Sequence, residues 1–127
     1  MTGANGTGHG KVILLGEHAV VHGQPAIALS LRESLVVSLG PDRGELESDT
    51  DLERALEAAA TALGVERPTR LGVTVRGDLP VAVGLGSSAA LAVGLVRALA
   101  GLAGRPLADA EAGRLANEVE KLSLIHI

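Results

Sequence analysis

The sequence predicts an α+β fold in which strands and helices do not strictly alternate. Runs of β-branched and apolar residues at 11–15, 25–39 and 71–75 indicate strands. Longer segments whose apolar residues recur at helical spacing lie between the second and third strands and fill most of the last third of the chain. Strands and helices without regular alternation favour an α+β arrangement over a parallel α/β sheet.

The N-terminal part of the chain is expected to hold the first two strands. Residues 1–9 are polar and rich in glycine, so we expect a flexible lead-in there, with the first strand at Lys11–Leu15. Residues 25–39 predict one long strand or two short ones, because a polar stretch interrupts the apolar run. Pro41 is expected in the turn that follows.

Helices are expected before and after a third strand. Residues 51–63 predict a helix, because leucines and alanines recur there at helical spacing, and Gly64 is suited to end it. Residues 71–75 alternate apolar with other side chains, which is typical of a half-buried strand. A helix that runs to about Ala103 is apolar nearly all round and should be buried. A final helix is expected over residues 107–122.

Composition narrows the functional class. A chain of 127 residues is one domain at most, or a piece of a larger one. The formal charge of −4 gives no basic surface for nucleic acid, and the absence of cysteine excludes disulfides and thiolate metal sites. The longest apolar stretch, residues 89–104, contains Arg97 and is too short to span a membrane. Residues 1–10 do not resemble a signal peptide, so we expect a soluble, cytoplasmic protein.

A glycine-serine loop, Gly84–Ala89, directly precedes the long apolar helix. Glycine lets backbone approach a ligand closely, and the free amides and dipole of a helix start favour an anion such as phosphate. A plain turn with serine caps needs neither two glycines nor two serines. A dinucleotide-binding fold is disfavoured, because the next acid, Asp109, does not follow a strand. A Walker A loop is absent, which leaves a kinase phosphate loop of another class.

A second motif, GKVILLGEHAVVHG, spans residues 10–23. Lys11 opens a predicted strand and can contact a phosphate, while Glu17 and His18 fall in the loop after it, where functional residues commonly lie. On spacing alone, a solvated Lys11 and Glu17 is the simpler interpretation. The spacing of His18 and His22 suggests a metal site, but alanine replaces the glutamate of the H-E-x-x-H zinc motif, so zinc is not expected.

Taken together, residues 10–28 and 80–90 resemble the GHMP kinase superfamily, and the mevalonate kinases within it. A third stretch, residues 117–121 (NEVEK), resembles the family helix that supplies an acidic Mg²⁺ ligand. The resemblance implies an incomplete GHMP kinase N-terminal domain over residues 10–122, with a fold like domain 2 of ribosomal protein S5. Residues 123–127 form an atypical tail, and the C-terminal domain of the family is absent from the chain.

The resemblance also implies ATP and Mg²⁺ as cofactors and mevalonate as the substrate. The reaction would transfer the γ-phosphoryl group of ATP to the 5-hydroxyl of mevalonate, a step of isoprenoid precursor synthesis. Lys11 would be catalytic, Ser88 and Glu120 would bind the metal, and Glu17 and His18 would lie on the mevalonate side. The implied nucleotide-binding residues are Ala82, Val83, Gly84, Leu85, Gly86, Ser87 and Ser88.

The family pattern fails after Leu122. Family members continue into H-G-x-P-S-G-x-D, whose aspartate is the expected catalytic residue, and no Pro-Ser-Gly-x-Asp occurs in this chain. We therefore expect the chain as given to be an inactive fragment that exposes apolar faces. Two alternatives stay open, namely another GHMP kinase, such as a phosphomevalonate or homoserine kinase, and a non-catalytic nucleotide-binding module. No membrane partner is expected. For the full-length protein, a homodimer is one of the oligomeric states that the resemblance allows.

Overall fold

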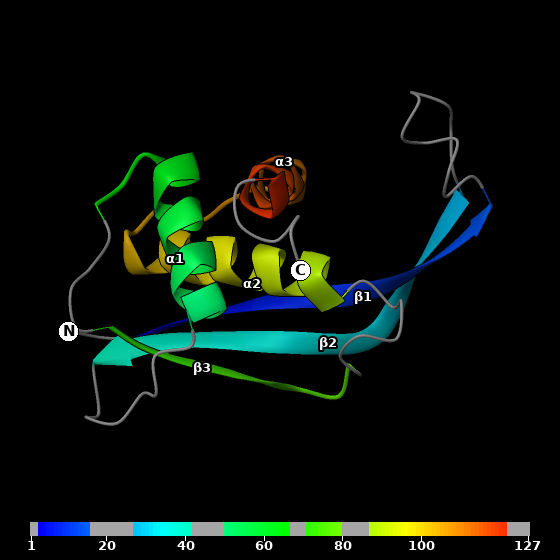
Figure 1. Ribbon diagram of the computed structural model, residues 1–127, viewed down its shortest axis with the longest axis horizontal. Coiled ribbons are helices and arrows are strands. Elements are labelled where there is room, and N and C mark those ends of the chain that lie inside the picture. Colours follow the sequence, from blue (N-terminus) through cyan, green and yellow to red (C-terminus); the bar gives the residue numbers. More distant parts are fainter. Residues whose placement is uncertain (1–2, 16–26, 42–49, 67–70, 80–86, 122–127) are drawn as a thin grey trace.

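The structure, a computed structural model, describes residues 3–15, 27–41, 50–66, 71–79 and 87–121 (Figure 1). Three strands and three helices follow one another in these ranges. They are β1 (Ala4–Leu15), β2 (Ile27–Pro41), α1 (Thr50–Leu63), β3 (Leu71–Gly77), α2 (Ser87–Leu102) and α3 (Asp109–Val119). The order confirms the α+β class, since the strands gather on one side of the molecule and the helices on the other (Figure 1).

The sheet has the order β1-β2-β3, and both pairings are antiparallel. Its centre is β2, a single long strand, which settles the choice between one strand and two over residues 25–39. Gly6 pairs with Val37, and Val37 pairs in turn with Val75, so these three residues lie on the same face of neighbouring strands. The β1–β2 register shifts between His9 and Lys11 and again near Leu15.

The lead-in expected over residues 1–9 is wrong for residues 4–9, which form the first half of β1 and pair with β2. The glycines that suggested flexibility have a packing role instead. Gly6 and Gly8 are buried, and both lie on the face of β1 that meets α2. A glycine at every second position matches the two-residue period of a strand whose inner face must stay flat.

Helix α2 lies between the sheet and the other two helices. It packs against β1 and β2 on one side, and α1 and α3 pack against it and against each other (Figure 1). Its leucines and valines point in several directions and are buried on each, as Leu95, Val96 and Leu99 show with at most 1% exposure. The expectation of a buried helix that is apolar nearly all round is therefore confirmed.

The contact between α2 and β1 is made by backbone. A methyl group added at Gly6 would overlap the carbonyl oxygen of Gly94 and lie 2.5 Å from the amide nitrogen of Ala98. From the helix side, a methyl group at Gly94 would lie 2.8 Å from Cγ2 of Val37. The helix can approach this closely because glycine occupies both sides of the crossing, and the side chain of Val37 from β2 fills the space beside Gly94.

Helix α1 begins at Thr50 and ends as the sequence predicts. Gly64 takes a φ of +71°, a conformation that favours glycine. Its amide donates to the carbonyl of Thr61, and the amide of Val65 donates to the carbonyl of Ala60, which is the Schellman arrangement. The guanidinium of Arg105 donates to the carbonyl of Leu63, so the segment after α2 completes the end of α1.

Two predicted elements differ in detail. In β3, Val73 packs against the core, but Val75 is 38% exposed, so the expected half-buried pattern is only partly correct. The described helices meet the sheet at β1 and β2, which leaves the inner face of β3 uncovered near Val75. Helix α3 is shorter than the predicted 107–122, because it spans Asp109–Val119 and then widens into a π turn at Glu120 and Lys121. In the described residues, no helix is both long and apolar enough to cross a membrane.

The close backbone contact between β1 and α2, called the seam below, predicts that alanine destabilises the protein at Gly6. At Gly113, which lies outside the seam, alanine should stabilise it. Gly6→Ala forces a methyl group into the backbone of α2 and should lower the free energy of unfolding by about 1–3 kcal/mol. A methyl group at Gly113, an exposed position of α3, would meet nothing within 4 Å. Gly113→Ala should therefore raise the free energy of unfolding by about 0.5–1 kcal/mol. Urea unfolding followed by far-ultraviolet circular dichroism measures both. A stabilising effect of Gly6→Ala would contradict the close backbone contact between β1 and α2.

Candidate functional site

The described residues on either side of positions 80–86 both lie at the first turn of α2. Residues 80–86 lie outside the described residues, but Leu79 before them and Ser87 after them are placed. Leu79 is 3% exposed and forms a small apolar cluster with Leu35 of β2 and Ala90 of α2. The loop therefore leaves from a residue buried against the first turn of α2 and returns at the start of that turn.

A hydrogen bond holds the same corner from the outside. A carboxylate oxygen of Asp78 accepts from the backbone amide of Ser34 at 3.0 Å, across the end of the β2–β3 pair. Asp78 immediately precedes Leu79, so the polar and apolar contacts of these neighbours fix the chain direction on entry to the loop. Loops that bind ligands are commonly positioned in this way by a rigid scaffold.

The first turns of α2 and α3 differ in charge. The helix starts at Ser87 and Ser88, and no acidic residue lies in its first turn. The first turn of α3, in contrast, carries Asp109 and Glu111, which offset the positive end of its own dipole. Of these two helices, only α2 therefore has no acidic side chain that offsets the partial positive charge of its first turn. The helix starts earlier than the sequence predicted, because Ser87, Ser88 and Ala89 of the expected loop Gly84–Ala89 lie in its first turn.

The motif at residues 10–23 begins in β1, which leads toward the same end of α2. Gly8 lies against the backbone of Ala90 in the first turn of the helix. Lys11 is three residues further along β1, paired with Ser30, or roughly 10 Å beyond Gly8 at the rise of a strand. The backbone of Lys11 and the start of α2 thus lie at one end of the helix–sheet seam. Glu17 and His18 lie outside the described residues, as do Ala82 to Gly86.

Glu120 follows the last residue of α3. Its backbone amide donates to the carbonyls of Ala116 and Asn117, and the residue is half-buried. The preceding Val119 is fully buried in the core that α3 shares with α2. Glu120 therefore leaves a helix end that is held against the side of α2. Within the ranges that the structure describes, no group of three or more His, Cys, Asp or Glu is placed to hold a metal ion.

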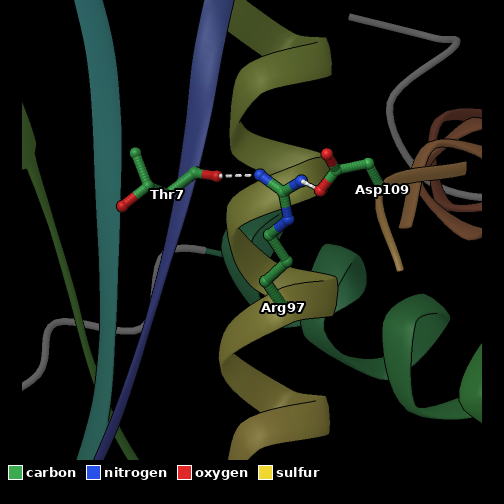
Figure 2. A network of polar contacts seen from close by, with 3 residues as sticks. All are labelled: Thr7, Arg97 and Asp109. Atoms are coloured by element: carbon green, nitrogen blue, oxygen red, sulfur yellow. Dashed lines mark hydrogen bonds and ion pairs between the residues drawn. The ribbon is translucent and has the colours of Figure 1, made fainter. Parts of the chain in front are cut away.

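Arg97 links β1, α2 and α3, and sequence reasoning did not find this role (Figure 2). From the middle of α2, one guanidinium nitrogen donates to the carbonyl of Thr7 in β1 at 2.8 Å. The other donates to a carboxylate oxygen of Asp109, the first residue of α3, at 2.8 Å. Its side chain is 30% exposed, whereas that of Asp109 is 98% exposed. A lone arginine inside an otherwise apolar helix was the available signal.

Comparison with known proteins supports a single family. The profile of the GHMP kinases N terminal domain matches residues 51–124, more than half of the chain. Mevalonate kinase from Pyrococcus horikoshii is 31% identical over 88% of this chain. The crystal structure of mevalonate kinase from methicillin-resistant Staphylococcus aureus is 30% identical, covers 97% of this chain and superposes with a TM-score of 0.70.

The fold reaches beyond these enzymes. The structure of Lactococcus lactis galactokinase complexed with galactose superposes on 96% of this chain with a TM-score of 0.75, although only 16% of the residues are identical. The chain spans less than half of each protein, namely 42% of the Pyrococcus enzyme, 46% of the Staphylococcus structure and 38% of the galactokinase. Fold similarity alone therefore does not distinguish among the alcohols that these kinases phosphorylate.

The two contacts of Arg97 are expected to differ in strength. Arg97→Met removes a charged donor from the half-buried bond to Thr7 and should lower the free energy of unfolding by about 1–2 kcal/mol. Asp109→Asn removes the exposed ion pair and one of the two carboxylates in the first turn of α3. It should lower the free energy of unfolding by less than about 1 kcal/mol, and by less still at high salt. Urea titrations of both variants at low and high salt test this. Equal losses at low salt would show that the ion pair, not the bond to β1, holds Arg97.

Proposed function

Because the chain belongs to the GHMP kinase family, we propose that it is the ATP-binding N-terminal part of a mevalonate kinase. The whole protein would transfer the γ-phosphoryl group of ATP to the 5-hydroxyl of mevalonate. One observation carries the proposal, namely the glycine-serine loop that enters from buried Leu79 and ends at the acid-free start of α2. Backbone amides at the start of a helix stabilise the negative charge of a phosphate even where no basic side chain is present.

The residues that we assign to this chemistry are of the required types. The amides of the loop from Ala82 to Ser88 would hold the ATP phosphates, and Lys11 would add positive charge near the reacting hydroxyl. Mg²⁺ fits the remaining groups, because the Ser88 hydroxyl and the Glu120 carboxylate are hard oxygen ligands. When bound, the metal would neutralise phosphate charge. Glu17 and His18 are the proposed contacts to mevalonate.

Mevalonate is favoured over other alcohols by sequence and not by fold. The galactokinase shares the fold at low identity, whereas the two mevalonate kinases keep about a third of the residues over most of this chain. The segment GEHAVVHG, residues 16–23, is the most substrate-specific part of the resemblance. A phosphomevalonate or homoserine kinase is the second candidate, and a non-catalytic nucleotide-binding module is the third.

Nucleotide binding can be measured on the chain itself with the fluorescent analogue MANT-ATP, since the chain has no aromatic side chain to interfere. We expect Ser88→Ala to weaken binding by about tenfold in Mg²⁺ and to remove most of the gain in affinity that Mg²⁺ gives. The matched variant Ser87→Ala should retain that gain. Loss of the Mg²⁺ effect in both variants, or in neither, would contradict the assignment of Ser88.

The substrate is tested by joining residues 1–121 to the remainder of the Pyrococcus horikoshii mevalonate kinase. We expect ADP release from ATP with mevalonate, and release at least about tenfold slower with phosphomevalonate, homoserine or galactose. The 127-residue chain alone should give no turnover, because it contains no Pro-Ser-Gly-x-Asp. Preference for another alcohol would favour the second candidate. ATP binding without turnover of any alcohol by the fusion would favour the third.

A further inference from the structure

We propose that Gly8 is a positioning residue, whose contact with the first turn of α2 sets where the phosphate-binding end of that helix lies relative to Lys11. The proposal rests on the proposed function, since it assigns a task to a residue outside the loop and outside the motif that begins at Gly10. Sequence patterns placed Gly8 in a lead-in with no role. Its importance follows only from its place in β1 opposite Ala90.

The contact leaves no room for adjustment. A methyl group at Gly8 would lie 2.8 Å from Cα of Ala90 and would overlap the carbonyl oxygen of that residue. Both groups are helix backbone, so neither can rotate away as the end of a long side chain would. Ala90 is itself 0% exposed and is enclosed by Leu35 and Leu79. A larger residue at position 8 must therefore move the strand or the first turn of the helix.

The place of the contact along α2 gives it a specific consequence. Ala90 lies two residues after Ser88 and packs against Leu79, from which the glycine-serine loop departs. A displacement of Ala90 moves the backbone at the start of α2, where we propose that phosphate binds. Transition-state stabilisation by preorganised amides depends on their exact placement, so a shift of this kind weakens phosphate binding before it unfolds the domain.

Gly6 provides a matched control on the same strand. A methyl group at Gly6 meets Gly94 and Ala98, further along α2 and away from its first turn. In that region, Leu95 and Leu99 secure the helix in the core that it shares with α1 and α3. The same chemical change at Gly6 and at Gly8 therefore strains one seam at two places. Only the change at Gly8 bears directly on the phosphate-binding turn.

The test compares Gly8→Ala, Gly6→Ala and the unmodified 127-residue chain in three measurements. They are Mg²⁺-dependent affinity for MANT-ATP, stability to urea, and amide hydrogen exchange of residues 88–91. We expect Gly8→Ala to weaken nucleotide binding by about tenfold or more and to speed exchange in the first turn. Gly6→Ala should lose at least as much stability but less than about threefold in affinity. Equal losses of affinity in the two variants, or none in Gly8→Ala, would overturn the proposal.

A second pair of variants decides the matter where Gly8→Ala does not fold. Leu35→Val thins the cluster around Ala90, whereas Leu39→Val makes the same change on the same face of β2 away from it. Weaker binding of MANT-ATP by Leu35→Val, but not by Leu39→Val, would support the proposal that these contacts position the first turn of α2. Equal affinity in the two variants would overturn the proposal. If the unmodified chain binds no MANT-ATP, the proposed function fails. The hydrogen-exchange comparison then still decides whether the contacts around Ala90 position the helix.

Discussion

The rest of the fold depends on how closely the backbone of α2 approaches the backbone of β1. Gly6 and Gly8 on the strand and Gly94 on the helix carry no side chains themselves, so the backbones of the two elements come close together. This seam sets the height of α2 above the sheet. The height in turn decides where α1 and α3 pack, because both rest on α2. An enlarged residue at the seam would therefore be felt throughout the helical layer.

The same seam explains how a chain without Phe, Tyr or Trp builds a core. Aromatic side chains fill wide gaps, whereas this core is made of leucine, valine and many alanines. Small side chains bury enough surface only if the elements lie close together, and the glycines and alanines of α2 permit that closeness. Helix α2 is buried on its sheet side and on its helix side, so it joins the two layers.

Charge distinguishes the ends of the helices. The first turn of α3 carries two carboxylates, and one of them also accepts a hydrogen bond from Arg97, so its dipole is locally balanced. The first turn of α2 carries serine and alanine only, so no acidic side chain in that turn offsets its dipole. In the apolar cluster of Leu35, Leu79 and Ala90, the first turn of α2 packs against β2 and the residue that follows Asp78. The arrangement combines an apolar cluster with a helix start that has no acidic side chain in its first turn, which fits the proposed binding of phosphate.

The sequence by itself determined the features that depend on local periodicity and composition. The end of helix α1 at Gly64 and the burial of α2 were readable from short segments. The family followed from the motifs at residues 10–28 and 80–90, the second of which includes the glycine-serine loop. The tertiary structure decided what depends on neighbours distant in sequence. It made residues 4–9 a strand, because α2 needs a flat surface there. It exposed Val75, because the described helices do not reach β3, and it gave Arg97 its partners on β1 and α3. Periodicity records which face of an element is apolar, but only packing shows which element covers that face.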